Sequence, residues 1–473
     1  MYRYLIFYLF ISTFCQAGNS IVDNSAFEGS AAENCYLNGN YDCAYEGFFV
    51  AAENGSADAQ HFIGLMYKVG QGVSQNYREA LKWFRLAAEQ EDSEGLYDLG
   101  FMYLEGLGVK RNYSQAIRYF YDAANQGHVV SQYQLGQIYD LGQGVAVDKE
   151  TAAKWYQSAA SKGHVVSQSL LGLMYADGEG VPRSYALSAK WLRAAALQNY
   201  MFAQHTLGFM YEVGRGVEQS YTNALHWYKK AANLGDRDAH YALARLYKEG
   251  KAVKRNLDVS MSHLTKSAYQ GNVQAQLELA QAYERGKYVV RNLEQAVKWY
   301  RLAANNGSPQ AQHFLGLLYK VGAYYKKNEA LAIEWFEKAA AQNDVESQKN
   351  LASILLRSSV NSEDYEKGID WLTLAAKSGD ADGQYRLSQS LKEAKDKPEL
   401  AHAWLLKAAV NGKAAAQYDL AISLLESTNA SKERIFSRQK KAEKWLALAA
   451  NQGHRLAQLK LVELYSIVKK KVD

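Results

Sequence analysis

The sequence predicts an all-α protein built as an αα-hairpin repeat solenoid. Its nine tryptophans all occupy the same position of a repeating unit. From Trp83 to Trp371 this position recurs every 36 residues, with Tyr119 and His263 at the two places where tryptophan is absent. A fixed period of about 20–50 residues is typical of stacked repeats, each of which buries its apolar face against its neighbours.

The first helix of each unit is indicated by segments such as Ala59–Tyr67, in which apolar residues recur at helical spacing. A small residue lies in the middle of this helix, where glycine costs about 1 kcal/mol relative to alanine. We therefore expect the small residue to let the second helix approach closely, with the tryptophan filling the adjacent space. This small column comprises Gly64, Gly100, Gly136, Gly172, Gly208, Ala244, Ala280, Gly316 and Ala352.

The second helix carries the pattern Ala-x-x-Trp-aromatic-x-x-Ala-Ala, as in Ala80–Ala88. The two helices are joined by a Gly-x-Gly-Val loop, for example Gly70–Val73. Its first glycine suits a left-handed helix cap, and its valine can fold back onto the helix pair. These loops follow helices rather than strands, so they do not predict a nucleotide-binding site.

The combination of Ala-x-x-x-Leu-Gly-x-x-Tyr-x-x-Gly-x-Gly-Val with Ala-x-x-Trp-Tyr-x-x-Ala-Ala-x-x-Gly resembles the Sel-1-like repeat family, a relative of the tetratricopeptide repeats. The resemblance is strong over residues 57–342, the regular 36-residue repeats, and weak elsewhere. It implies a right-handed superhelix of helix pairs. It also implies a role as an adaptor or scaffold, and it implies no reaction.

Residues 1–17 are predicted to be a secretory signal peptide. Arg3 precedes the apolar run Tyr4–Phe14, and small residues stand before a cut after Ala17. A lipoprotein signal acylated at Cys15 is the alternative, although Phe14 is large where that signal prefers a small residue. No later segment reaches about 18 uninterrupted apolar residues, so we expect no membrane span and an exported protein, periplasmic or secreted to the cell surface.

Residues 18–56 are predicted to form an N-terminal capping helix pair. Cys35 and Cys43 flank the turn Asn38–Asn40, and an even cysteine pair in an exported chain suggests a disulfide. Because the spacing is not Cys-x-x-Cys, we interpret the bond as a staple of the first helix pair rather than a redox site.

Residues 343–473 are predicted to be degenerate repeats with a C-terminal cap. The helical pattern persists there while the loops vary in length, as expected of terminal units. A second contact surface made by these variable loops is the alternative interpretation.

Composition and motifs exclude several function classes. The formal net charge of +5 is spread along 473 residues, so no nucleic-acid partner is predicted, and the basic Lys469–Lys471 is interpreted as a solvated end. The sequence contains no His-Glu-x-x-His, paired cysteine-ligand or nucleophile-elbow spacing. We therefore predict no catalytic residues, no metal site and no cofactor, with an unrecognised hydrolase of cell-wall material as the disfavoured alternative.

Two columns of the first helices are candidates for a partner-binding groove. The position three residues before the small column carries many Tyr and His side chains, which suit protein interfaces, and the position one residue after it would lie beside them. Packing of the tyrosines between neighbouring units is the alternative. The candidate residues are His61, Tyr97, Phe101, Tyr133, His205, Phe209, Tyr241, Arg245 and His313.

The favoured function is an exported scaffold that holds a protein or peptide in the concave groove. Exported members of the family that the chain resembles include host-interacting and virulence-associated proteins, one of them an immunoglobulin A-binding protein. Others assist envelope or polysaccharide-secretion machinery. A host-facing role predicts release or surface exposure, with a host protein such as an immunoglobulin as a predicted partner. An envelope role predicts retention in the periplasm.

Overall fold

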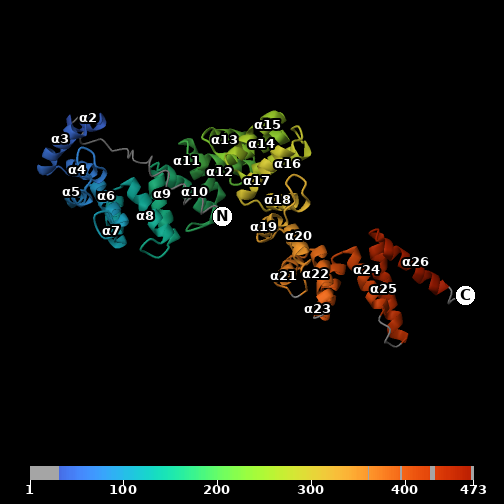
Figure 1. Cartoon of the computed structure of the whole chain (residues 1–473). Coiled ribbons are helices and arrows are strands. Elements are labelled where there is room, and N and C mark those ends of the chain that lie inside the picture. The colour runs from blue at the N-terminus through green and yellow to red at the C-terminus, as the bar shows by residue number, and fades with distance from the viewer. Residues whose placement is uncertain (1–30, 361, 395–396, 427–431, 470–473) are drawn as a thin grey trace. The chain divides into compact units, whose positions relative to one another are not determined.

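The structure is a computed structural model that describes residues 31–469, apart from 361, 395–396 and 427–431. The described residues contain 25 α-helices, which pack as hairpins in chain order (Figure 1). The prediction of an all-α hairpin-repeat solenoid is therefore confirmed. The predicted signal peptide, residues 1–17, lies outside the described residues. The described helices form two compact units, one that ends at Asp236 and one that begins at Arg237.

The first unit contains six helix pairs. In each pair an even-numbered first helix packs against the odd-numbered second helix that follows it. The helices are α2 (Ala31–Leu37), α3 (Tyr41–Glu53), α4 (Ala57–Val69), α5 (Tyr77–Glu89), α6 (Ser93–Glu105), α7 (Tyr113–Asn125), α8 (Val129–Leu141), α9 (Lys149–Ser161), α10 (Val165–Asp177), α11 (Tyr185–Leu197), α12 (Met201–Val213) and α13 (Tyr221–Asn233).

The second unit continues the same alternation and ends on an additional helix. Its helices are α14 (Arg237–Glu249), α15 (Leu257–Tyr269), α16 (Val273–Arg285), α17 (Leu293–Asn305), α18 (Pro309–Val321), α19 (Glu329–Ala340), α20 (Val345–Leu355), α21 (Glu363–Lys377), α22 (Ala381–Ala394), α23 (Pro398–Val410), α24 (Ala414–Glu426), α25 (Lys432–Asn451) and α26 (Arg455–Lys469).

Local sequence fixes both ends of each loop. At the end of α4, Gly70 adopts φ +85° and donates its N–H to the carbonyl of Met66, so the predicted left-handed glycine cap is confirmed. At the start of α5, the side chain of Asn76 accepts hydrogen bonds from the N–H groups of Arg78 and Glu79. An Asn, Asp or Ser caps the start of most second helices in the same way. The glycine that ends the first helix and the residue that caps the second helix therefore set the length of the loop between them.

The contact at the small column differs from the prediction in one respect. The side chain that fills the space opposite Gly64 is Phe84, the residue after the tryptophan: a Cβ added to Gly64 would lie 2.5 Å from its ring. Phe84 is fully buried, whereas several tryptophans, such as Trp191, are only partly buried. The helical turn places the residue after the tryptophan toward the first helix and the tryptophan toward the neighbouring repeat.

A glutamine near the start of the first helix links successive repeats, a feature that the sequence interpretation missed. In α10, Gln168 donates from Nε2 to the carbonyl of Ala160 at 3.1 Å and accepts from Gln198 at 2.9 Å. The same donation, always to the residue eight positions earlier, is made by Gln60, Gln132, Gln204, Gln276, Gln312, Gln348, Gln384, Gln417 and Gln458. The recurrence of glutamine at one position of the repeat is the sequence signal from which this link could have been predicted.

The first helix pair carries the predicted disulfide. Cys35 of α2 and Cys43 of α3 are bonded, with their Cα atoms 5.8 Å apart, which confirms the predicted bond. Asn40, between them, caps α3 by accepting from the N–H of Cys43. Among the described helices, none is both long and apolar enough to cross a bilayer.

Candidate functional site

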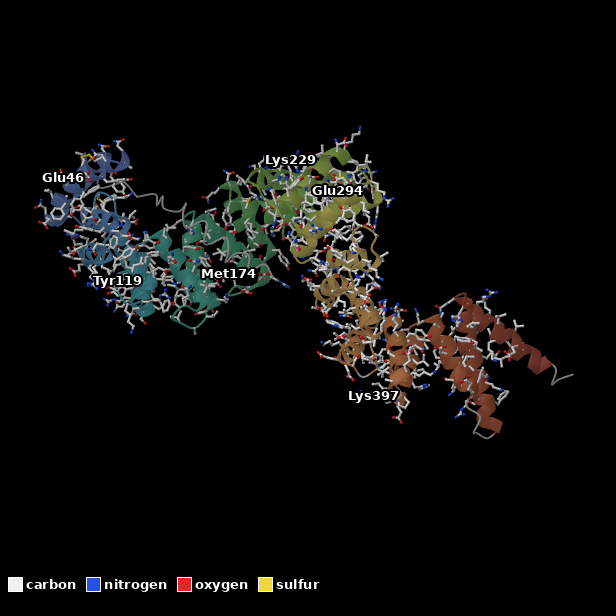
Figure 2. The ribbon with its side chains drawn as sticks, in the orientation of Figure 1. Glu46, Tyr119, Met174, Lys229, Glu294 and Lys397 are labelled. Atoms are coloured by element: carbon white, nitrogen blue, oxygen red, sulfur yellow. A yellow bond between two sulfur atoms is a disulfide. The ribbon has the colours of Figure 1, made fainter. Side chains whose placement is uncertain are left out.

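A groove lies along the first helices α6, α8, α10 and α12 of the first unit. Its volume is about 1510 Å³, well above the roughly 300–1,000 Å³ of pockets that hold small molecules. Met174 of α10, which lines the groove, is marked in Figure 2. A volume of this size along four parallel repeats fits a segment of polypeptide better than a small ligand.

The register one residue after the small column, here called the groove floor, is apolar in the groove lining except at Gln137 of α8. Phe101, Leu173 and Phe209 each stand one residue after the small column, and all three line the groove. Phe209 is 44% exposed, so its ring is available to a partner. Exposed apolar side chains that gather in one patch mark interaction sites more often than scattered ones.

The lining of the groove carries more negative than positive charge. Its lining includes Glu105, Asp140, Asp177 and Glu179, against Lys149 and Arg215 as the cations. Lys149 forms an ion pair with Asp140, and the guanidinium of Arg215 lies over the Tyr185 ring, 5.1 Å from its centroid. The lining therefore holds a surplus of two carboxylates.

The column three residues before the small position makes contacts from one repeat to the next. His61 Nε2 lies 2.8 Å from Asp98 Oδ2, and Lys68 Nζ donates to Asp98 Oδ1 at 2.6 Å. Burial alone would raise the pKa of Asp98, but Lys68 and His61 outweigh it and hold that pKa at about 2. Burial opposes the charge of His61, yet Asp98 raises its pKa above the ordinary value. His61 is thus enclosed in a polar junction.

Two predicted tyrosines pack against histidines of the next repeat. The rings of Tyr97 and His128 have centroids 5.0 Å apart, and those of Tyr133 and His164 are 4.6 Å apart. Burial raises the pKa of both tyrosines well above the ordinary range. Burial also lowers the pKa of His164 to about 4, which keeps its imidazole neutral.

The remaining members of this column make similar contacts. His205 Nδ1 lies 3.8 Å from Asp236 Oδ1, and Tyr241 donates to Glu278 Oε2 at 3.4 Å. His313 Nδ1 lies 2.8 Å from Ser347 Oγ. Nearly the whole column therefore serves contacts between repeats, and partner binding by its residues stays a prediction. Phe101, Phe209 and His205 are the predicted residues that also line the groove.

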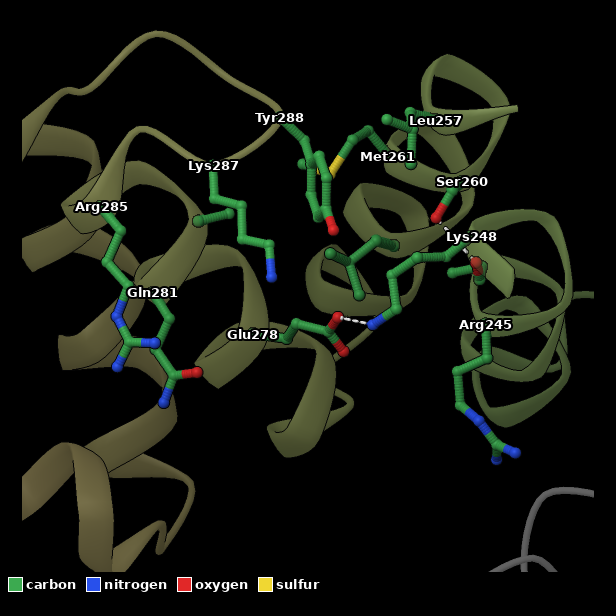
Figure 3. A pocket seen from close by; sticks show the side chains of 13 residues that line it. Arg245, Lys248, Leu257, Ser260, Met261, Glu278, Gln281, Arg285, Lys287 and Tyr288 are labelled. Atoms are coloured by element: carbon green, nitrogen blue, oxygen red, sulfur yellow. Dashed lines mark hydrogen bonds and ion pairs between the residues drawn. The ribbon is translucent and has the colours of Figure 1, made fainter. Parts of the chain in front are cut away.

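Arg245 belongs to a different cavity, in the second unit. This cavity holds about 180 Å³ and lies among α14, α15 and α16 (Figure 3). Its lining is rich in cationic side chains, in contrast to the groove lining, which has a surplus of carboxylates. The sequence prediction assigned Arg245 to the groove from its register alone. The separate cavity could not be predicted in this way, because the loop after α16 contributes to its lining.

The chain is similar to known repeat proteins. A profile of the Sel1 repeat matches eleven segments, which run from 57–92 to 414–454. A crystal structure of a protective antigen from uropathogenic Escherichia coli strains, with an SLR fold, is 33% identical, covers 90% of each chain and has a TM-score of 0.64. A Sel1 repeat protein from Oxalobacter formigenes is 31% identical over 65% of this chain and 89% of that one, with a TM-score of 0.57. No curated protein matches the sequence.

Proposed function

We propose that this chain, which belongs to the Sel1 repeat family, is an exported, non-catalytic scaffold that binds a segment of a partner protein in the groove of its first unit. The observation that carries the proposal is the groove itself, about 1510 Å³ with Phe101, Leu173 and Phe209 along its floor. Apolar surface removed from water contributes about 25 cal/mol per Å². Aromatic anchors in such a floor would therefore supply most of the affinity.

Export is supported by two independent features. The disulfide between Cys35 and Cys43 is of a kind that persists in oxidising compartments. The apolar run Tyr4–Phe14 reads as the core of a signal peptide. We propose that the mature chain begins at Gly18 and is periplasmic or presented outside the cell.

The similarity to a protective antigen supports a host-facing partner rather than an envelope adaptor. Fractionation followed by mass spectrometry of the terminal peptide tests this part of the proposal. We expect a mature chain starting at Gly18 at the cell surface or in the medium. A chain that keeps Met1 in the cytoplasm would contradict export, and a chain confined to the periplasm would favour the envelope role.

Site-specific photocrosslinking tests the groove. A benzoyl-phenylalanine at position 209 should capture a partner in the living cell or its medium, because Phe209 is 44% exposed on the groove floor. The matched control is position 121, since Tyr121 is 48% exposed but lies on the second helix α7, outside the groove lining.

A second change makes the crosslinking result specific. Phe101→Ala should reduce the adduct formed at position 209, because both residues line the same floor. Equal adducts at positions 121 and 209, or an adduct at 209 that Phe101→Ala leaves unchanged, would contradict binding in the groove.

A further inference from the structure

Two carboxylates in the lining of the groove stand where a carboxylate disfavours its own helix. Glu105 and Asp177 are the last residues of α6 and α10, and both line the groove. The carbonyl end of a helix carries a partial negative charge, which favours lysine or arginine there and disfavours a carboxylate. Residues that break such a local rule without compensation are expected at functional sites.

Neither carboxylate is compensated by a neighbour in the chain. Glu105 and Asp177 are exposed, and neither side chain makes an ion pair or a hydrogen bond with another described residue. The same register is compensated elsewhere: Glu249, the last residue of α14, lies 2.8 Å from the ammonium of Lys251 in the following loop. The loops after α6 and α10 hold a leucine and a glutamate at the position of that lysine.

The arginines of these two loops do not replace the missing lysine. The guanidinium of Arg183, in the loop after α10, lies over the Tyr185 ring, 5.7 Å from its centroid. Arg111, in the loop after α6, is exposed and forms no ion pair with a described residue.

The other charges of the lining do not remove the surplus. Lys149 is paired with Asp140, and Glu179 has an interaction within the protein. When Arg215 is counted against Glu179, the two helix-terminal carboxylates are still left without a cation in the lining. A cationic group that enters the groove from solvent is therefore favoured.

The lining alternates between charge and apolar surface at the register of Glu105 and Asp177. The last residue of α8, which comes between α6 and α10, is Leu141; it lines the groove and is 50% exposed. In a solenoid, residues at one register of successive repeats lie on one face. A polypeptide along this face meets a carboxylate, an apolar side chain and a second carboxylate in succession, beside the groove floor.

We propose, on the basis of the function proposed above, that the segment bound in the groove is basic and apolar. Its lysine or arginine side chains pair with Glu105 and Asp177, and apolar side chains between them pack on Leu141 and the groove floor. Exposed ion pairs contribute little each, so the apolar contacts supply most of the affinity while the carboxylates select the partner. An acidic segment is rejected because it would bring like charges together.

Fluorescence anisotropy with the full mature chain and labelled peptides of about 15 residues tests the proposal. One peptide repeats the unit Lys-Leu-Ser, and its counterpart repeats Glu-Leu-Ser. We expect saturable binding of the lysine peptide that weakens as salt is raised, and at least tenfold weaker binding of the glutamate peptide. The variant Glu105→Gln/Asp177→Asn should bind the lysine peptide about three- to tenfold more weakly.

Charge reversal adds a change of preference. Glu105→Lys/Asp177→Lys should make the chain prefer the glutamate peptide, without loss of helical content by circular dichroism, because lysine suits the end of a helix. The matched control is Glu53→Lys/Glu89→Lys, which reverses the exposed last residues of α3 and α5 in the same unit, outside the lining. The control should keep the preference for the lysine peptide.

The outcomes distinguish the basic segment from the groove itself. Equal binding of the two peptides that Phe209→Ala weakens equally would overturn the basic segment and leave binding in the groove standing. So would the absence of binding by either peptide while position 209 still crosslinks a partner. A reversed preference in the control variant would show attraction to net charge alone and would also overturn the proposal. Binding of the lysine peptide that Phe209→Ala leaves unchanged would contradict both the basic segment and the groove.

Discussion

The close contact at the small column makes a quantitative prediction at Gly136. A Cβ at this position would lie 2.5 Å from two ring carbons of Tyr156, which is fully buried. Carbon atoms in good contact are about 3.5–4.0 Å apart, so the ring must move by roughly 1 Å. Overpacking of a core site costs about 1–3 kcal/mol. Alanine regains about 1 kcal/mol of helix propensity, so Gly136→Ala should destabilise the region by about 0–2 kcal/mol net.

A double-mutant cycle removes the propensity contribution. The gain from replacing glycine is the same whether position 156 is Tyr or Leu, so it cancels from the coupling energy. With Tyr156→Leu the ring is gone, and the chain already has alanine at the small position with leucine at the matching one, as in Ala244 and Leu264. We expect Gly136→Ala to be about 1–3 kcal/mol less harmful in the leucine background.

Alanine also stands opposite a tyrosine once in the chain, and the structure shows why that site differs. Ala280 matches Tyr300, whose ring stacks on Phe314 with centroids 3.8 Å apart. The residue at the register of Phe314 beside Tyr156 is Leu170, which offers no such stacking partner. The tolerance at position 280 therefore does not transfer to position 136.

Hydrogen–deuterium exchange of the α8 and α9 peptides is the suitable assay, because long repeat arrays do not unfold in one cooperative step. Exchange gives the local opening free energy of the helix pair in each of the four proteins of the cycle. A coupling energy within about 0.5 kcal/mol of zero, the range of additive sites, would refute the assignment of Tyr156 as the side chain that the glycine accommodates.

Three further predictions concern other contacts. Mass spectrometry under non-reducing conditions should find Cys35 bonded to Cys43, and two free thiols would refute the staple. The variant Cys35→Ser/Cys43→Ser should lower the protection of α2 and α3 from hydrogen exchange by about 2–3 kcal/mol, the value expected for a short disulfide loop. NMR titration should give His164 a pKa near 4. Stability should be lost as the pH falls from about 6.5 toward 4, because the unfolded chain takes up the proton at a higher pH than the folded chain. A pKa near the ordinary 6.5 would contradict the burial of His164. Gln168→Ala should lower the local opening free energy by about 1 kcal/mol more than Gln204→Ala, because the side-chain oxygen of Gln168 accepts a hydrogen bond and that of Gln204 accepts none. Equal losses in hydrogen–deuterium exchange of the α10 and α12 peptides would exclude the link.

Much of the architecture is determined by the sequence alone. The 36-residue recurrence of Trp83, Trp155 and their counterparts specifies a hairpin repeat, because helices of fixed length joined by capped loops can bury their apolar stripes only by stacking. The glycine caps and the cysteine pair are equally local: Gly70 needs only its own backbone, and Cys35 and Cys43 are a few residues apart. Such features do not depend on distant parts of the chain.

The identity of the packed and the exposed side chains was decided only by the tertiary structure. Adjacent residues on a helix differ in direction by about 100°, so sequence could not tell whether Trp83 or Phe84 faces Gly64. The ladder of His61, Tyr97 and Tyr133 had the composition of a binding face, but its atoms contact the next repeat 31–37 residues later. The small cavity among α14, α15 and α16 is lined by side chains of two successive repeats, so its shape depends on how these repeats dock.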